Sequence, residues 1–331
     1  MAHDTTDSVA RMPDAASRVP DARDIAPPEL GVAPPSSLHG LQGWLMRWAA
    51  SGWLPIRGFW PRAEFEPQAK GGRLRIEIVS HCWNYSHLLE HQLGSLVLHP
   101  PREVEATMTV YFCREDRRTA RLLEVAAKQE PANVRWQWRA LAKEHLFRRS
   151  IGRNHAALAT RADWIWFTDC DLLFGEGCLD ALGRALQGRV EPLVYPRQEN
   201  LTTLLDDAAL VGEAEPRLRQ PSGELEFSST IATKAKGPLQ ITHGDVARAL
   251  GYCRDISCYQ RAEREFQKCR EDTAFRWILG THGVPIDLPG VSRLRHASKG
   301  RYHGSEASNK LRLFARRLQE RWRARRRHAK S

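Results

Sequence analysis

Short apolar runs alternate with helically spaced apolar residues through the first half of the chain. Runs rich in β-branched and aromatic residues predict four strands, at residues 74–80, 106–112, 134–138 and 164–168. Apolar residues at helical spacing predict the helices between them, at residues 87–98, 122–125 and 147–158. This alternation is typical of an α/β, Rossmann-like fold in which a mostly parallel sheet carries helices on both faces.

The second half of the chain shows less regular patterns. Residues 237–252 predict a strand, a short helix and a Gly-aromatic turn, and residues 270–279 predict a helix that begins with two acids. Four prolines make residues 187–233 a predicted long loop, and residues 294–304 are a predicted flexible, basic loop. These segments complete a single predicted domain over residues 73–304.

Charge and composition set the two ends of the chain apart from this domain. Residues 1–37 hold six acids, three arginines and six prolines, so we expect this segment to be disordered. It lacks a basic start followed by an apolar core, which argues against a secretory signal. Residues 305–331 are predicted to form a basic amphipathic helix, with ten Lys or Arg residues around a stripe of Leu311, Phe314, Leu318 and Trp322.

Two apolar segments outside the domain have more than one interpretation. The stripe within residues 309–331 either docks on the domain or lies in the plane of an anionic membrane. Without a recognition module, we expect no specific nucleic acid as a partner. The tryptophan-rich lead-in at 38–72 is either a second membrane contact or an ordinary buried helix face of Leu41, Trp44, Leu45 and Trp48.

Composition excludes some other classes of protein. No run of 18 uncharged apolar residues occurs, which argues against a membrane-spanning helix. The seven cysteines form no C-x-x-C pair, which favours a reducing, cytoplasmic setting over a disulfide framework. Most of the net charge of +11 comes from the C-terminal tail, because residues 38–308 carry only about +5. The domain itself is therefore only mildly basic.

Polar residues follow three of the predicted strands, at 80–83, 113–116 and 169–171. In open parallel sheets, ligands bind beyond these strand ends. Asp169 and Asp171 repel each other and lose hydration there, so a cation is expected to neutralise them. A divalent ion shared with a diphosphate suits this need. The alternatives are two acids that cap the next helix, or a phosphatase nucleophile, which Leu173 at the last position of that motif argues against.

Five segments then occur in a set order: Phe-x-Arg-x4-Asn, D-x-D, Gly-aromatic, Glu-Asp at a helix start, and Arg-His. In this order they resemble GT-A fold glycosyltransferases, in particular family-2 enzymes and the galactosyltransferase-type C-terminal region, over about residues 73–304. The resemblance implies transfer of a sugar from a nucleotide-sugar, above all a UDP-sugar, to a glycan or lipid-linked acceptor in surface polysaccharide synthesis. With the basic tail, it implies a cytoplasmic enzyme that is peripheral on the inner face of the plasma membrane.

The resemblance implies a site for Mn²⁺ or Mg²⁺. Asp171 would be the direct ligand, and Asp169 would contact the donor ribose or reach the metal through water. His296 would complete the site, since neutral imidazole is a good ligand for Mn²⁺, and His303 is the second choice. The alternative for both histidines is a surface residue in a basic loop.

The resemblance also implies contacts with the donor. Arg149 is similar to an arginine that contacts donor phosphate or uracil, and Asn154 lies at matching helical spacing, with an outward polar residue as its alternative. Lys299 and Arg301 would stabilise charge on the departing phosphate. The other expected donor-site residues follow strands and are Ser80, Trp83 and Asp116.

Transfer to a hydroxyl also needs a base, because a hydroxyl is too weak an acid to attack unaided. Asp272 is the predicted base and Glu271 the predicted acceptor contact, with the two roles open to exchange. The alternative is that both acids only favour the N-terminus of their helix. A base opposite the leaving group predicts inversion, and residues 187–233 would form a flap on the acceptor side.

One segment departs from the family pattern. Family members usually follow the second strand with an acidic pair and Gly-Ser that read the base, whereas this chain has Cys-Arg-Glu-Asp at 113–116. Glu115 or Asp116 would do that work here. The departure favours an alternative function, a non-catalytic GT-A-like protein that binds anionic membrane or polymer through its basic tail.

Overall fold

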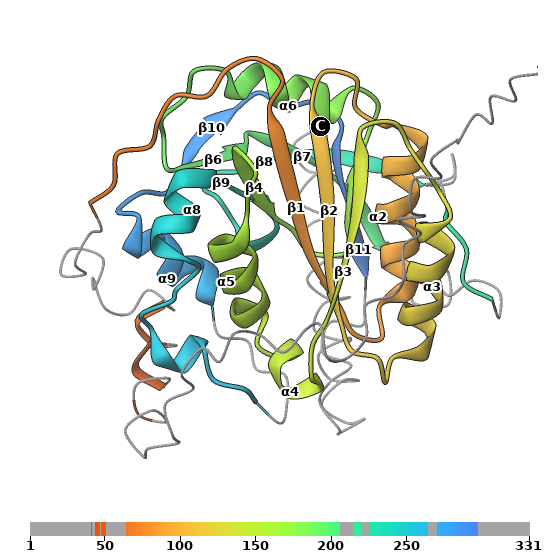
Figure 1. Cartoon of the computed structure of the whole chain (residues 1–331), viewed down its shortest axis with the longest axis horizontal. Helices are drawn as coiled ribbons and strands as arrows, with labels where there is room; N and C mark the ends of the chain where they lie inside the picture. The colour runs from red at the N-terminus through yellow and green to blue at the C-terminus, as the bar shows by residue number, and fades with distance from the viewer. Residues whose placement is uncertain are drawn as a thin grey trace, which may run out of the picture.

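In the part of the chain that the structure describes, the strands form two sheets, one of seven strands and one of four (Figure 1). The computed structural model describes residues 41, 44–46, 48–50, 64–205, 215–219, 225–263 and 270–296. The predicted segments 1–37 and 305–331 lie outside these residues. No helix in the described part of the chain is long and apolar enough to cross a bilayer.

Half of the large sheet is the parallel core that the sequence predicts. Four neighbouring strands pair in parallel, in the order β4 (Trp164–Phe167), β1 (Arg75–Cys82), β2 (Glu105–Phe112) and β3 (Val134–Ala140). All four predicted strands are therefore confirmed. Because parallel strands run the same way, their carboxyl ends meet at one edge of the sheet.

The other half of the large sheet mixes strand directions. β9 (Gln240–His243) runs antiparallel to both β4 and β6 (Leu193–Pro196), and β10 (Val284–Ile286) is parallel to β6. Parallel pairs still outnumber antiparallel ones in this sheet. The predicted α/β class with a mostly parallel, Rossmann-like sheet is confirmed.

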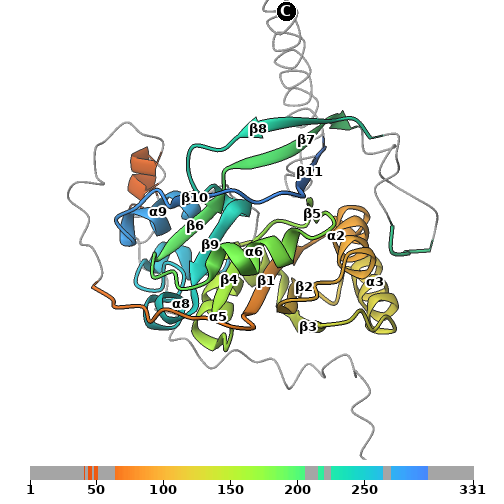
Figure 2. The same cartoon turned by 90° about the horizontal axis from the view of Figure 1, so that it is seen from above.

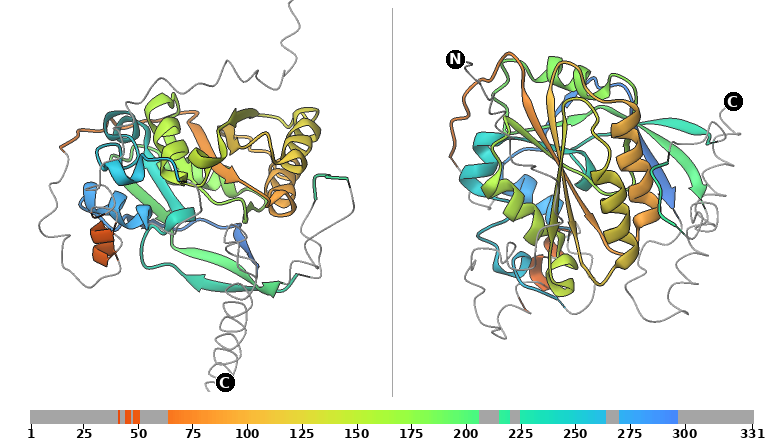
Figure 3. Two further views of the ribbon diagram at one scale, coloured as in Figure 1. Left: turned by 90° about the horizontal axis from the view of Figure 1, so that it is seen from below. Right: turned by 45° about the vertical axis from the view of Figure 1, so that its right-hand side comes forward.

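The predicted helices are also present, with boundaries within a few residues. The described helices are α2 (Ser86–Leu98), α3 (Arg117–Ala127), α4 (Lys143–Leu146), α5 (Arg149–Ala159), α6 (Cys178–Leu186), α8 (Gly244–Leu250) and α9 (Glu271–Ile278), with 3₁₀ turns η4 (Gly237–Leu239) and η5 (Ser257–Tyr259). The described residues between 41 and 50 are helical as well. α2 and α3 pack together on one side of the strands (Figures 1 and 3).

Helices cover both faces of the parallel core. Ser80 and His81 are neighbours on β1, so their side chains point to opposite faces of the sheet. Ser80 Oγ donates a hydrogen bond to Gln92 Oε1 of α2 at 2.7 Å, whereas the His81 ring lies against Gly152 of α5. Therefore α2 and α5 lie on opposite faces, as Figure 2 shows.

A second sheet corrects two predictions. Its order is β5 (Leu172–Phe174), β11 (Val291–His296), β7 (Gln198–Leu205) and β8 (Phe227–Ile231). The predicted loop over 187–233 is wrong where β6, β7 and β8 lie, and the predicted flexible loop over 294–304 is wrong for residues 294–296. In Figure 2 this sheet forms a layer of its own beside the large sheet.

The polar sequence of β7 explains the first of these errors. Glu199 is buried in this strand, and its carboxylate lies 3.1 Å from the ammonium of Lys236 and 3.1 Å from the guanidinium of Arg293. These partners come from distant segments, so the local pattern of polar residues is that of a loop although the strand is partly buried.

Candidate active site

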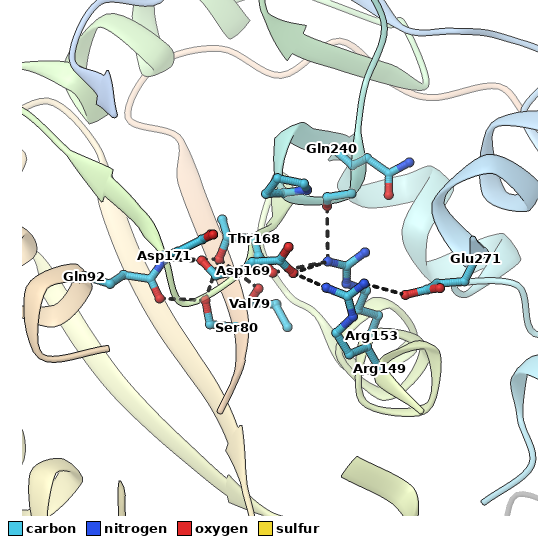
Figure 4. A network of polar contacts seen from close by, with 12 residues as sticks. Val79, Ser80, Gln92, Arg149, Arg153, Thr168, Asp169, Asp171, Gln240 and Glu271 are labelled. Carbon is cyan, nitrogen blue, oxygen red and sulfur yellow. Dashed lines mark hydrogen bonds and ion pairs between the residues drawn. The ribbon is translucent and has the colours of Figure 1, made fainter. Parts of the chain in front are cut away.

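The segment after β4 stays attached to β1. The Thr168 amide donates to the Val79 carbonyl at 2.8 Å, and the hydroxyls of Thr168 and Ser80 are hydrogen-bonded at 2.5 Å. Gln92 Nε2 donates to the Asp169 carbonyl at 3.0 Å (Figure 4). Ser80 is fully buried in this network, so its hydrogen bonds hold in place the segment that carries the two aspartates.

Two guanidiniums meet the carboxylate of Asp169. Arg149 donates a hydrogen bond from Nη1 to Asp169 Oδ1, and Arg153 Nη2 lies 3.4 Å from the same oxygen. Arg149 also reaches α9, where its Nη2 lies 3.1 Å from Glu271 Oε1. The sequence expectation that a cation neutralises this acid is therefore met, in part, by arginines of α5 (Figure 4).

Arg153 is a residue that the sequence analysis missed. Its side chain is fully buried and donates to the carbonyls of Thr168 and Gly237 at 3.2 and 3.1 Å, and to the Tyr252 hydroxyl at 2.9 Å. It thereby ties α5 to the end of β4 and to two later segments. A signal was present, because residues four apart share one face of a helix and Arg153 follows Arg149 at that spacing.

The charges in this group stabilise one another. Although burial opposes its charged form, the carboxylates of Asp169 and Glu271 hold the pKa of Arg149 well above its ordinary value. Burial raises the pKa of Glu271, but the charges of Arg149 and Arg153 outweigh it and hold that pKa below the ordinary value. Glu271 is therefore ionised at neutral pH, and Arg149 bridges its carboxylate and that of Asp169.

Asp171 lies on the other side of Asp169 from the arginines (Figure 4). Its Oδ2 is 3.9 Å from Nε2 of His296, and both side chains are buried. The Leu294 amide donates to the Asp171 carbonyl at 2.9 Å, which holds β11 against this segment. The structure thus brings together the two residues that the resemblance implies for a metal site, and His296 ends a strand and is not a surface residue.

This pair lies close to the spacing of two ligands of one metal ion. In an octahedral ion with bonds of about 2.1 Å, neighbouring ligand atoms lie about 3.0 Å apart and opposite ones about 4.2 Å apart, so the pair, at 3.9 Å, has to adjust by a few tenths of an ångström to share one ion. The described residues include no group of three or more His, Cys, Asp or Glu that could hold a metal. The chemistry of the pair, one carboxylate and one imidazole, suits Mn²⁺ or Mg²⁺ only if a ligand supplies further oxygens.

The two acids of α9 differ in their surroundings. Glu271 is buried against Arg149, whereas Asp272 has 27% of its side chain exposed and its Oδ2 lies 3.6 Å from Arg276 Nη1. Gln240 Nε2 donates to the Asp272 carbonyl at 3.1 Å, which fixes the start of α9 against β9. Asp272 is therefore the acid that a molecule from solution can reach.

Asn154 has a clear structural partner. It is fully buried, and its Oδ1 accepts a hydrogen bond from the Tyr252 amide at 2.9 Å. Gly251 has a φ of +63°, and a Cβ there would lie 2.2 Å from Asn154 Oδ1, so only glycine fits this turn. The alternative of an outward polar residue at Asn154 is wrong, and the predicted Gly-aromatic turn is held by this side chain.

Asp116 and Trp83 lie beyond the ends of β2 and β1. The Asp116 carboxylate accepts hydrogen bonds from the Thr119 amide at 3.1 Å, the Thr119 hydroxyl at 2.6 Å and the Asn84 amide at 2.6 Å, so it caps α3. The Trp83 ring is partly buried, with Lys143 Nζ 5.0 Å from its centre. Their roles toward a donor stay predictions.

The three remaining candidates, Lys299, Arg301 and His303, lie outside the described residues.

Comparisons with known proteins find similarity among solved structures. No protein-family model and no curated protein matches the chain. Among solved structures, the chain is similar to the mannosyltransferase PcManGT from Pyrobaculum calidifontis in complex with GDP-Man and Mn²⁺. The two are 17% identical, the similarity covers 86% of this chain and 73% of that chain, and the TM-score is 0.40. At that identity and score, the similarity carries no argument about the activity of this chain.

Proposed function

We propose that the protein is a metal-dependent, inverting glycosyltransferase that moves a sugar from a nucleotide-sugar to a glycan or lipid-linked acceptor. The observation that carries this proposal is the placement of His296 beside Asp171, at 3.9 Å, from segments more than a hundred residues apart. The sequence resemblance implies that these two residues lie together. A UDP-sugar as donor and surface polysaccharide as product remain the preferred choices from that resemblance.

Asp171 and His296 would hold Mn²⁺ or Mg²⁺, and the donor diphosphate would supply further oxygens. When bound, this ion would neutralise the negative charge that develops on the leaving diphosphate. Arg149 lies at the same edge of the sheet with 30% of its side chain exposed, so it can contact a donor phosphate while it stays paired with Asp169.

Asp272 would accept the proton of the acceptor hydroxyl. Its carboxylate is partly exposed and stands at the N-terminus of α9, whereas Glu271 is buried against Arg149. Glu271 would therefore act on the acceptor side chiefly by holding Arg149 in place. With the base on the face opposite the leaving group, the acceptor oxygen attacks the anomeric carbon as the bond to the diphosphate breaks and the hydroxyl proton passes to the base, so the configuration inverts in one step.

A panel of nucleotide-sugars tests the proposal. A donor that binds the native chain should raise its thermal unfolding midpoint, and Mn²⁺ should increase this shift. Asp171→Asn should abolish the Mn²⁺-dependent part of the shift and the hydrolysis of the donor. The matched control is Asp287→Asn, because Asp287 has 84% of its side chain exposed. Donor turnover that survives in Asp171→Asn with added Mn²⁺ would contradict the metal role.

One observation favours a second candidate, a non-catalytic protein with the same fold that binds anionic membrane or polymer. The Asp116 carboxylate accepts three hydrogen bonds from protein groups, so it is engaged in capping a helix where family members read the base. The same panel separates the two candidates. Absence of any Mn²⁺-dependent nucleotide binding by the parent chain would favour the second.

A further inference from the structure

The helical residues between 41 and 50 present two different faces. Met46, Ala49 and Ala50 are buried and belong to the hydrophobic core. The opposite face is exposed and is here named the Trp44 face; its members and exposed fractions are Leu41 (54%), Trp44 (54%), Leu45 (41%) and Trp48 (41%). The interpretation of these four residues as an ordinary buried helix face is therefore wrong.

This face is fixed to the acceptor side of the candidate site. Arg270 Nη1 donates a hydrogen bond to the Ala50 carbonyl at 2.9 Å. Arg270 directly precedes Glu271 and Asp272, the two acids at the start of α9. In Figures 1 and 2 the short red-orange helix lies beside α9. A surface that held the Trp44 face would therefore also hold the end of α9 that carries the proposed base.

The chemistry of the segment indicates a lipid surface. Residues 38–63 contain Arg47, Arg57 and Arg62 without any Asp or Glu, and they hold four of the eleven tryptophans of the chain. Tryptophan favours the boundary between headgroups and acyl chains, because its ring is apolar with one polar N–H. Cationic residues in an acid-free segment add attraction to anionic headgroups.

The size of the face argues against a second copy of the chain. Its four side chains expose about 400 Å² together, whereas a stable dimer buries about 800 Å² on each partner. An in-plane contact with a membrane needs no matching protein surface, and a helix of this kind inserts only its apolar side chains. The rings of Trp44 and Trp48 are stacked, with centroids 5.9 Å apart, and form one continuous apolar surface.

We propose that the Trp44 face docks the protein on an anionic lipid surface, and that the acceptor reaches Asp272 from that surface as a lipid-linked molecule. The second half of this inference rests on the proposed function; the first half does not. Docking through this face would hold the start of α9 near the membrane, because Arg270 ties it to Ala50 of the same helix. A lipid-linked acceptor then follows, because the proposed base, Asp272, would be held close to the lipid surface.

Vesicle binding by the full chain tests the docking. The probes are vesicles of phosphatidylcholine alone and of phosphatidylcholine mixed with phosphatidylglycerol. The parent should bind the mixed vesicles, and Trp44→Ser with Trp48→Ser should weaken this at least about 10-fold. A second variant, Leu41→Ser with Leu45→Ser, removes the other half of the face and should act in the same direction. The matched control is Ile231→Ser in β8, because Ile231 is 66% exposed and apolar; it should bind like the parent.

A spectroscopic measurement keeps the test independent of protein folding. Brominated acyl chains quench tryptophans that enter the bilayer, so the parent should lose fluorescence on brominated vesicles and the Trp44, Trp48 double variant should lose far less. Thermal unfolding of each variant shows that the fold is retained. Equal vesicle binding by the parent and both double variants would overturn the docking, and so would loss of binding only on deletion of residues 309–331.

Other outcomes separate the docking from the function. A dimer that the double variant breaks, with no vesicle binding by the parent, would overturn the proposal in favour of a second copy. Hydrolysis of a soluble nucleotide-sugar should be equal in the parent and the double variant, since the face does not touch the donor site. Vesicle binding that depends on the face, without any donor turnover in the parent, would support the docking and overturn both the acceptor class and the proposed function.

Discussion

Asp169 and Asp171 lie two positions apart, yet their surroundings differ. Asp169 has 28% of its side chain exposed and meets two guanidiniums, whereas Asp171 has 6% exposed and stands 3.9 Å from an imidazole. A turn separates them, closed by a hydrogen bond from the Leu172 amide to the Asp169 carbonyl at 3.1 Å. One acid is therefore neutralised by cations of the protein itself, and the other stands beside a side chain that binds metals when neutral.

This difference in surroundings indicates that the two aspartates have different roles. A single cation shared by both carboxylates, as the sequence pattern suggested, would give two similar environments. The structure has two separate ones, an arginine cluster (Arg149, Arg153, Asp169 and Glu271) and an Asp171–His296 pair. On the proposed function, the cluster positions the site and the pair binds the ion.

The largest expected effect distinguishes the two acids directly. Asp171→Asn should lower donor turnover about 1,000-fold, because a metal ligand is lost, with little change in the unfolding midpoint. Asp169→Asn should lower the midpoint clearly, because buried Arg153 loses its carboxylate partner. Steady-state hydrolysis and thermal unfolding measure both variants. Similar behaviour of the two variants in both measurements would contradict the division of work.

The next effect distinguishes the two arginines within the cluster. Arg153→Met should lower the free energy of unfolding by about 3 kcal/mol, because its carbonyl and hydroxyl partners are left buried without a donor. Arg149→Met should cost less stability, since Arg149 is partly exposed, and should chiefly raise the KM for the donor. The control is Arg184→Met, whose ion pair with Glu103 is exposed. Urea unfolding and kinetics separate them; a larger stability loss in Arg149→Met would reverse the assignment.

Local pattern was enough to predict the parallel core, whereas the meeting of Asp171 with His296 was implied only by the resemblance. The four strands of the parallel core carry β-branched and aromatic runs, and the carboxyl ends of such strands meet at one edge. The position of Asp171 follows from that rule. The approach of His296 does not follow from that rule. It came from the order of motifs in the resemblance, because the sequence of β11, Val-Ser-Arg-Leu-Arg-His, does not show the apolar pattern of a strand.

Long-range partners explain what the sequence could not predict. Glu199 is buried in β7 only because Lys236 and Arg293 meet it, and these lie 37 and 94 positions away. The same holds for the bridge from Arg149 to Glu271, which joins two helices remote in sequence. Single-segment periodicity does not record such pairs, so a strand with a buried charge and an arginine cluster both escaped prediction.

The Asp171–His296 pair predicts a smaller effect, on the affinity for Mn²⁺. His296→Asn should weaken Mn²⁺ binding in the presence of a nucleoside diphosphate about 10- to 100-fold, because one ligand of the pair is lost. The electron paramagnetic resonance signal of unbound Mn²⁺ measures this without any turnover. The control is His282→Asn, because His282 is an exposed histidine that is not part of the pair. Unchanged Mn²⁺ binding in His296→Asn would remove this residue from the metal site.

The smallest expected effect is on the pH dependence of stability, through His81, which lies near Arg149 and Arg153 of the arginine cluster. Burial, followed by the charges of Arg153 and Arg149, holds the pKa of His81 well below its ordinary value of 6.5. The unfolded chain therefore takes up a proton that the folded chain does not, so stability falls as the pH falls through 6.5. From pH 7 to pH 6 this group should lower the free energy of unfolding by about 0.7 kcal/mol. In urea unfolding at both pH values, His81→Leu should lose that part of the pH dependence and His282→Leu should keep it. An equal loss of stability in the parent and His81→Leu would show that the fold does not hold His81 neutral.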